Sequence, residues 1–256
     1  MGERLAAKVA LVTGAGSGIG RAVAVRMAEE GATVVVTSRT PSKVDETCGE
    51  VETRTATRPL GLVLDVTDTA SISAALAEVI DRLGRIDILS NNAGVDDPTE
   101  PTVVDMSDEV WDRTMLINVT GTFRVCRAVI PHMADGGSIV NMGSRDSLIA
   151  RRNAAAYCAS KAAVLQLTRT LALELASRRI RANCVCPGVV DTPLVDLFLD
   201  RSPDPVALRA EYASSNALGR LASAREIADC VIFLASDEAS FVTGTPLVVD
   251  GGAQSW

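Results

Sequence analysis

Tyr157 and Lys161, in the run AAAYCASKAAV, have the types and spacing needed for proton transfer, and Ser144 lies thirteen residues upstream of the tyrosine. If 157–175 forms a helix, residues four apart lie on one face, so the lysine ammonium would lie beside the tyrosine phenol. An unperturbed tyrosine has a pKa of about 10, and a fixed positive charge nearby favours the phenolate and lowers that pKa. The Ser144 hydroxyl could hold the oxygen that gains or loses the proton. The three residues predict redox chemistry on an alcohol or a carbonyl.

Short β-branched segments alternate with amphipathic or alanine-rich segments along the whole chain. This alternation predicts a parallel sheet with helices on both faces, and right-handed crossovers make it a doubly wound α/β fold of the Rossmann type. We expect seven strands in a single domain that spans 1–256. The expected strands are 8–13, 33–37, 60–65, 86–91, 138–143, 180–186 and 246–251. The expected helices lie near 18–30, 41–53, 69–83, 107–134, 157–177 and 224–236.

The segment 192–216 fits this alternation least well. It carries three prolines and separates the sixth expected strand from the last helix. An insertion near the carboxyl edge of a parallel sheet is typical of a lid or a substrate wall. The alternative is a helical hairpin that serves only packing.

Composition limits the classes of protein that the chain can belong to. It is 47% hydrophobic but only 3% aromatic, so Ala, Val, Leu and Ile must fill the core, as suits helices on a parallel sheet. The net charge of −7, without a basic run, argues against a nucleic-acid partner. No segment reaches the roughly 20 apolar residues of a membrane-spanning helix, and the first residues lack the apolar stretch of a signal peptide. We expect a cytoplasmic protein without a membrane partner.

Six cysteines and one histidine exclude several kinds of site. No CxxC pair occurs, and buried reduced thiols are favoured over disulfides. Cys184 and Cys186 are two apart in an expected strand, so they should share one side as small core residues. The single histidine, His132, follows a proline near an expected helix end, where a surface or capping role is favoured. We therefore expect no metal site.

The first expected strand leads directly into the glycine-rich run TGAGSGIG. A glycine-rich turn between a strand and a helix lets backbone approach a pyrophosphate, and the helix N-terminus offers free N–H groups. The spacing reads TGxxxGxG rather than GxGxxG, because position 19 is isoleucine. We expect Gly14, Ser17, Gly18 and Ile19 to contact a dinucleotide cofactor.

The end of the second expected strand predicts which nicotinamide cofactor binds. In NAD sites an acidic side chain here binds the ribose 2′-hydroxyl, but this strand ends in Ser38 and Arg39, and the first acid afterwards is Asp45. Ser38 can donate a hydrogen bond to a 2′-phosphate, and Arg39 can clamp it. NADP(H) is favoured and NAD remains possible. In the alternative, Arg39 is a solvated charge that stacks on adenine without discriminating.

Together these residues closely resemble the short-chain dehydrogenase/reductase (SDR) family, in its compact subtype of about 250 residues. The resemblance covers nearly the whole chain, from Lys8 to Gly252. Its motifs are TGAGSGIG at 13–20, Asp65-Val66, NNAG at 91–94, Asn118 in LINVTGTF, Ser144, YCASK at 157–161, PGVVDT at 187–192 and DGG at 250–252.

The resemblance implies a role for each motif. Asp65 and the Val66 backbone would bind adenine, and Asn92, Ala93 and Gly94 would close over the adenine ribose, although Asn91 and Asn92 could also be purely structural. Lys161 would hold the nicotinamide ribose, and Pro187, Gly188, Val190 and Thr192 would enclose the nicotinamide. Asn118 would bend its helix and hold a water that passes protons from Lys161. Tyr157 would give a proton to the substrate oxygen while Ser144 steadies it, since Ser147 has the wrong spacing.

The resemblance also implies a homotetramer or dimer. Helices 107–134 and 157–177 would pair across one two-fold axis, and the C-terminal segment would pack across another.

The loop 145–153, RDSLIARRN, departs from the family, whose loops at this place are usually small and apolar. One interpretation is recognition of a polar or anionic substrate by Arg151 and Arg152. In the other, which we favour, these charges face solvent or a neighbouring subunit.

The leading hypothesis is an NAD(P)(H)-dependent oxidoreductase that acts on a small secondary alcohol or ketone. A 3-oxoacyl-thioester reductase, or a sugar, polyol, steroid or xenobiotic carbonyl reductase, would fit. The alternative is a cofactor-binding regulatory or scaffold protein without turnover. An isomerase or dehydratase like the longer sugar-nucleotide members would need a larger C-terminal domain.

Overall fold

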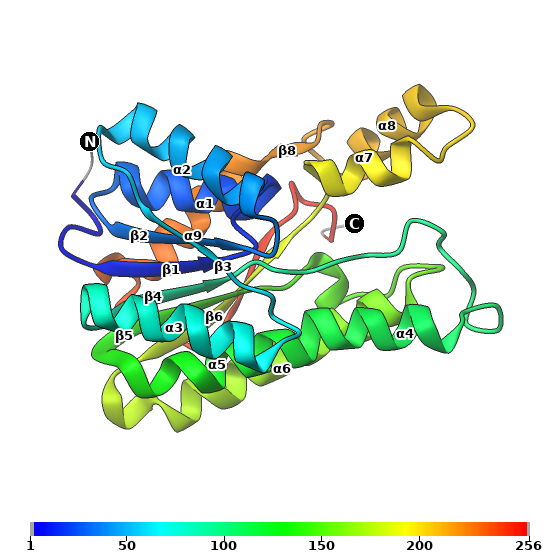
Figure 1. Ribbon diagram of the computed structural model, residues 1–256. Helices are drawn as coiled ribbons and strands as arrows, with labels where there is room; N and C mark the ends of the chain where they lie inside the picture. Colours follow the sequence, from blue (N-terminus) through cyan, green and yellow to red (C-terminus); the bar gives the residue numbers. More distant parts are fainter. Residues whose placement is uncertain (1–2, 255–256) are drawn as a thin grey trace.

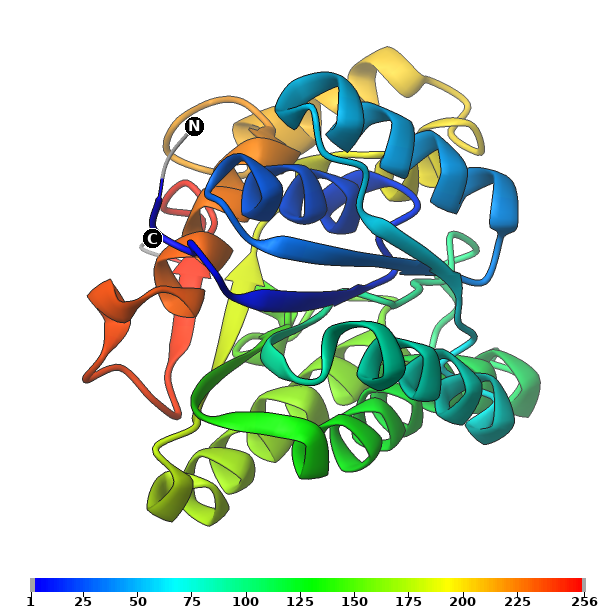
Figure 2. The same ribbon diagram turned by 60° about the vertical axis from the view of Figure 1, so that its left-hand side comes forward.

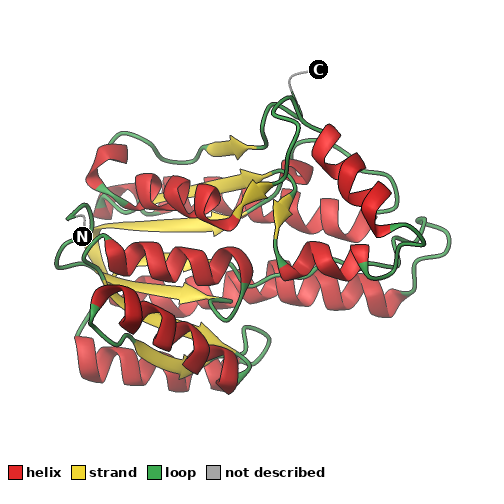
Figure 3. Cartoon of the chain, turned by 90° about the horizontal axis from the view of Figure 1, so that it is seen from above, coloured by secondary structure: helices red, strands yellow, loops and turns green. Residues whose placement is uncertain are grey.

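The computed structural model describes residues 3–254 of the 256-residue chain. Among these residues, seven parallel strands form one sheet in the order β3-β2-β1-β4-β5-β6-β9 (Figures 1 and 3). The strands are β1 (Val9–Thr13), β2 (Thr33–Ser38), β3 (Leu60–Val63), β4 (Ile86–Asn91), β5 (Met133–Met142), β6 (Arg181–Pro187) and β9 (Pro246–Val249). The chain builds the sheet outward from β1 to β3 in one direction and from β4 to β9 in the other, so the strand order reverses between β1 and β4, as in a doubly wound sheet. The expected fold class is confirmed.

Helices cover both faces of the sheet (Figure 2). One layer consists of α1 (Gly18–Glu29), α2 (Pro41–Thr55) and α9 (Ala224–Ala235), and the other of α3 (Thr69–Leu83), α4 (Asp108–Met115), α5 (Thr122–Val129) and α6 (Ala155–Glu174). Strand β1 is buried along its whole length, because a parallel strand between two helix layers has no face left for water. Small aliphatic side chains fill both cores, as the composition predicts.

The expected helix 107–134 is wrong as a single element. The chain instead forms α4, a π-helical turn η1 (Leu116–Gly121), α5 and a short 3₁₀ turn η2 (Ile130–His132). Strand β5 then begins at Met133, five residues before the expected start, with a register irregularity between its pairs to Ile86 and Ile88. The polar and glycine-rich residues 134–137 carry no strand signal, and they form the irregularity itself, because they lie between the pairs of Met133 with Ile86 and of Ser138 with Ile88, and Gly136 has a φ of +80°.

The segment 192–216 folds into two short helices, α7 (Pro193–Leu199) and α8 (Pro205–Ser214), which lie beyond the carboxyl end of β6 (Figure 1). The sequence analysis missed two short strands next to it, β7 (Val190–Asp191) and β8 (Ala222–Ser223), which pair with each other. This pair holds the chain that leaves β6 close to the start of α9.

The cysteines and the histidine lie largely where expected. All six cysteines are free, and Cys184 and Cys186 pack side by side against α6, with their sulfur atoms 3.9 Å apart. His132 is exposed in η2, in agreement with the expected surface position. Within residues 3–254 no helix combines the length and apolar character needed to cross a bilayer.

Candidate active site

A cavity of about 430 Å³ opens at the carboxyl ends of the strands, where ligands bind in doubly wound folds. Every residue that we expected to bind cofactor lines it, and so do three of the four expected catalytic residues, Ser144, Tyr157 and Lys161. The cofactor set consists of Gly14, Ser17, Gly18, Ile19, Ser38, Arg39, Asp65, Val66, Asn92, Ala93, Gly94, Tyr157, Lys161, Pro187, Gly188, Val190 and Thr192. The fourth expected catalytic residue, Asn118, lies behind this wall.

The glycine-rich turn forms a cradle that only glycine permits. Gly14 has a φ of +61°, and a Cβ there would lie 2.7 Å from the backbone nitrogen of Ala93. Gly18, with a φ of +52°, opens α1 next to Thr192. Ser17 precedes this helix but its hydroxyl makes no capping hydrogen bond, so the first N–H groups of α1 face the cavity. The cradle therefore fits the pyrophosphate of a dinucleotide.

The far end of the cavity carries two cationic side chains. Arg39 and Lys43 are exposed and line it together with Ser38 and Thr40. Across from them, Asp65 accepts hydrogen bonds from the N–H and the hydroxyl of Thr67, at 2.8 and 2.7 Å, which lower the pKa of its carboxyl. The sequence analysis missed Lys43 and Thr40, although both lie within five residues of Arg39.

The motif NNAG joins the sheet to the cavity wall. Asn91 is buried and donates to Asn141 at 2.9 Å, a contact inside the protein that supports its structural interpretation. The backbone N–H of Asn92 donates to the hydroxyl of Thr13 at 3.1 Å, which fastens the motif to the end of β1. The side-chain oxygen of Asn92 is buried without a hydrogen-bond partner, and its residue lines the cavity, where a ribose hydroxyl could satisfy it.

The three residues that suggested proton transfer, Ser144, Tyr157 and Lys161, meet at the other end of the cavity. Tyr157 and Lys161 lie one turn apart in α6, and Lys161 Nζ lies 5.6 Å from the centroid of the tyrosine ring. The ammonium also donates to the carbonyl of Met142 at 2.9 Å. Ser144 follows β5, and its hydroxyl accepts from the N–H of Asp146 at 3.1 Å.

Ser147, the competitor of Ser144, plays a supporting part in this turn. Its hydroxyl accepts from the backbone N–H of Ser144 at 3.1 Å, which completes a capping box around residues 145–147. Ser144 lines the cavity and Ser147 braces it.

The charge balance at Tyr157 differs from the simple picture in which Lys161 lowers its pKa. Burial raises the pKa of Tyr157 well above its usual value, and the carboxylates of Asp96 and Asp146 raise it further. Ser144 and Arg151 act in the opposite direction. Burial also lowers the pKa of Lys161. The sequence identified the cation on the same helix but missed the carboxylates, because they come from other loops.

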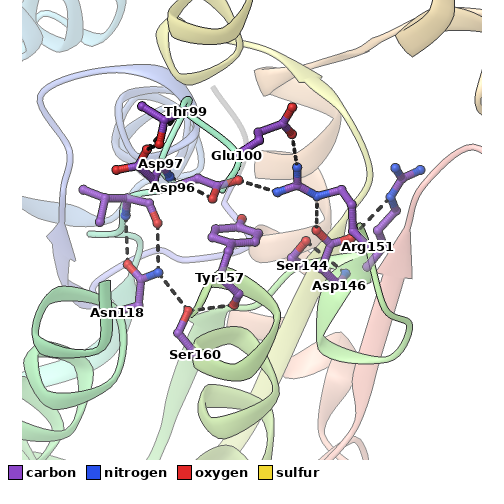
Figure 4. A network of polar contacts seen from close by, with 12 residues as sticks. Asp96, Asp97, Thr99, Glu100, Asn118, Ser144, Asp146, Arg151, Tyr157 and Ser160 are labelled. Carbon is purple, nitrogen blue, oxygen red and sulfur yellow. Dashed lines mark hydrogen bonds and ion pairs between the residues drawn. The ribbon is translucent and has the colours of Figure 1, made fainter. Parts of the chain in front are cut away.

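Asn118 lies in the π-helical turn η1, where an extra residue interrupts the helix and turns the side chain inward. Its amide oxygen accepts from the N–H of Val95 at 2.8 Å, and its amide nitrogen donates to the carbonyl of Val95 and to the hydroxyl of Ser160, both at 2.9 Å. The Ser160 hydroxyl donates to the carbonyl of Tyr157 at 2.7 Å. Asn118 thus ties the loop after β4 to the turn of α6 that carries the tyrosine (Figure 4).

The charged loop 145–153 does not simply face solvent, as we had favoured. Arg152 is exposed, but Arg151 turns inward and lines the cavity. Its guanidinium donates to Asp96 at 2.5 Å, to Glu100 at 2.7 Å and to Asp146 at 2.9 Å (Figure 4). The sequence analysis did not predict these three carboxylate partners, because two of them lie about fifty residues away in the chain.

The fold and the site together define a class of protein, an α/β oxidoreductase with a glycine-rich dinucleotide cradle and, at one end of the same cavity, a tyrosine, a serine and a lysine. Comparison with known proteins agrees. A family model described as Enoyl-(Acyl carrier protein) reductase matches residues 14–254.

Individual relatives match over nearly their whole length. The 3-oxoacyl-(acyl-carrier-protein) reductase FabG of Thermotoga maritima is 39% identical over 251 residues, which cover 97% of this chain and 98% of the relative. The 2-(R)-hydroxypropyl-CoM dehydrogenase of Xanthobacter autotrophicus is 39% identical over 247 residues, which cover 95% and 97%. The ligand-free structure of aldohexose dehydrogenase (AldT) of Thermoplasma acidophilum has a TM-score of 0.88 at 35% identity and covers 100% of this chain and 97% of its own.

The chain belongs to the short-chain dehydrogenase/reductase family. It is an NAD(P)-dependent oxidoreductase that interconverts alcohols and carbonyl compounds. The named relatives are reductases and dehydrogenases, and none of them favours the alternative of a scaffold protein without turnover.

Proposed function

We propose that the protein interconverts a secondary alcohol and a ketone with NADP(H), and that Tyr157 is the acid and base. The observation that carries the proposal is the meeting of Tyr157, Ser144 and Lys161 at one end of the cavity, beside the loop 187–192. When bound there, the nicotinamide supplies or accepts the hydride. Tyr157 gives the substrate oxygen a proton in reduction and removes it in oxidation, and Ser144 holds that oxygen.

Two further residues would support this proton transfer. The Lys161 ammonium favours the phenolate that remains after the proton has left, and it can hold the ribose hydroxyls of the nicotinamide. Asn118 holds the loop after β4 and the Tyr157 turn together, and we propose that a water beside it passes protons from Lys161 toward solvent.

The substitution Tyr157→Phe tests the role of the tyrosine. It removes the proton and leaves the ring, so kcat should fall by about a hundredfold or more while cofactor binding persists. The chain has one other tyrosine, Tyr212, which lines the cavity from α8. Tyr212→Phe should alter KM and keep turnover. Full activity of Tyr157→Phe would refute the proposed mechanism.

We propose NADP(H) over NAD(H) because cations and hydroxyls meet at the end of β2. Arg39 and Lys43 offer two positive charges to a 2′-phosphate, and Ser38 offers a hydroxyl. Fluorescence titration should show tighter binding of NADPH than of NADH. Arg39→Ala should weaken NADPH binding about tenfold and leave NADH unchanged, whereas Arg54→Ala, at the far end of α2, should change neither. Tighter binding of NADH by the wild-type protein would overturn this assignment.

For the substrate we propose an uncharged ketone or secondary alcohol with further hydroxyl groups, such as a sugar or polyol. One wall of the substrate end is polar, because the carboxylates of Asp96 and Asp146 are paired there with the guanidinium of Arg151. Leu194 and Phe198 of α7 add apolar side chains to the lining of the cavity.

Helices α7 and α8 would act as a lid over such a substrate. A panel of neutral polyols, aliphatic ketones and acyl thioesters, followed by nicotinamide absorbance, tests the substrate class. Preference for the anionic acyl thioesters would refute it.

We also propose a homotetramer, or a dimer, built on the helices that the family pairs. Apolar side chains are exposed on that side of the molecule, namely Trp111 of α4, Phe123 of α5 and Leu173 of α6. At the C-terminal side Phe241 is fully exposed next to β9. Faces of this kind are typical of subunit contacts.

A further inference from the structure

A cluster of ion pairs, which the proposed reaction does not yet use, surrounds the ring of Tyr157. Arg151 is at its centre, with a side chain 25% exposed. The carbon atom of its guanidinium lies 5.7 Å from the centroid of the tyrosine ring. Figure 4 shows the ring with the Arg151 guanidinium on one side of it and Asp96 beside both.

We infer that Arg151 is a positioning residue for the reaction. Its guanidinium neutralises the carboxylates next to Tyr157 and so sets the pH range in which the tyrosine exchanges its proton. The inference rests on the proposed role of Tyr157 as acid and base. It assigns a function to the charged loop by which this chain departs from its family.

Burial makes these carboxylates act strongly on the tyrosine. The side chains of Asp96 and Asp146 are 11% and 5% exposed, so little water screens their charges. Each of them opposes formation of a phenolate at Tyr157, and Arg151 favours it. The guanidinium therefore acts twice, directly on the ring and by pairing with both carboxylates.

The other charged groups near the ring cannot replace Arg151. Lys161 donates to the backbone carbonyl of Met142 rather than to a carboxylate. Arg145 lies 3.5 Å from Asp146 but pairs with neither Asp96 nor Glu100. Among the described residues, Arg151 is the single ion-pair partner of those two carboxylates.

The same contacts connect the two loops that border the substrate end. Asp96 and Glu100 belong to the loop after β4. Asp146 belongs to the loop after β5, and its backbone N–H donates a hydrogen bond to the hydroxyl of Ser144. A planar guanidinium can bind three carboxylates at once, whereas a lysine ammonium is a point charge on a flexible stem. Tyr212 approaches the cluster from α8, where burial and then Glu100 raise its pKa and Arg151 lowers it.

The test compares the pH profiles of kcat/KM in both directions for wild type and variants with NADP(H) saturating. Arg151→Met should move the rising limb of the oxidation profile and the falling limb of the reduction profile to higher pH, by about one unit or more. Asp96→Asn should move both limbs to lower pH. The double variant should return them toward the wild-type position. A merely structural role would lower the height of the profiles and leave the limbs in place.

Three controls make the outcome clear. Arg152→Met removes the exposed arginine next in the chain and should leave the profile unchanged. Arg151→Lys keeps the charge, so its limbs should stay near the wild-type position while KM rises because the loops loosen. Circular dichroism and thermal unfolding identify any variant that fails to fold, in which case Asp96→Asn alone decides.

Limbs that stay in place in both Arg151→Met and Asp96→Asn, or that move in the opposite directions, overturn the inference. If Tyr157→Phe retains full activity, the proposed function itself fails. If Tyr157→Phe is inactive and the limbs do not move, only the role of Arg151 fails.

Discussion

Replacement of Lys161 by methionine tests most directly how Tyr157 works. The ammonium lies 5.6 Å from the centroid of the tyrosine ring. If the phenolate charge is placed at the ring centroid, Coulomb's law with an effective dielectric constant of about 20 gives about 3 kcal/mol between it and this ammonium. Because about 1.4 kcal/mol corresponds to one pH unit, loss of the ammonium should raise the pKa of Tyr157 by about two units. This rise adds to the one that burial, Asp96 and Asp146 already cause.

The assay is the pH profile of kcat/KM for alcohol oxidation, with cofactor saturating. In the proposed mechanism Tyr157 is the base in this direction, so activity should rise with pH through its pKa, and the variant should need a higher pH for the same activity. We expect an inflection about two units higher and a loss of at least about tenfold at neutral pH. Methionine keeps much of the length of the side chain, so packing should change little.

Another lysine of the chain provides the control. It has three lysines, and Lys8→Met, just before β1, should keep the wild-type profile. If Lys161→Met loses activity but keeps its inflection, Lys161 acts by holding cofactor and not through charge on the tyrosine. If the variant keeps full activity, both parts of the reasoning are wrong.

Three other substitutions have definite expected results. Gly94→Ala would place a methyl group 3.2 Å from the amide oxygen of Asn118 and 3.3 Å from Nζ of Lys161, so kcat should fall severalfold while circular dichroism stays unchanged. Gly49→Ala, inside α2 with open space around the new methyl, should raise the free energy of unfolding by about 0.5–1 kcal/mol in urea titration. Leu173→Glu places a charge on the most exposed part of the α6 face and should reduce the mass measured by light scattering; an unchanged mass would remove this face from the subunit contact.

Most of the fold could be predicted from the chain because its signals are local. All seven strands of the sheet were expected, since each is a short aliphatic run between turn residues, and six match the structure closely. The helix 107–134 was not resolved into its parts. Its π-helical turn ends at Gly121, which packs so closely against Val66 that a Cβ would lie 2.7 Å from a valine methyl, and no periodicity of the helix itself contains that contact.

The candidate site divides in the same way. The cofactor cradle was predictable because a strand, a glycine-rich turn and a helix start are continuous in the chain, and the tyrosine and lysine are one helical turn apart. The carboxylates that surround Tyr157 could not be predicted in this way. Asp96 and Asp146 are fifty residues apart, and they meet only because β4 and β5 are neighbours in the sheet, so that the loops after both strands open at the same edge.

The sequence by itself therefore determined the class of fold and predicted which residues would form the cofactor cradle and the proposed proton-transfer group, because each depends on residues close together in the chain. Only the tertiary structure decided the electrostatic surroundings of Tyr157. Charge acts through space rather than along the chain, and burial at the strand ends strengthens it by excluding water. For that reason the tyrosine beside Lys161 has its pKa raised, and an arginine from the loop that looked solvent-facing opposes the carboxylates around it.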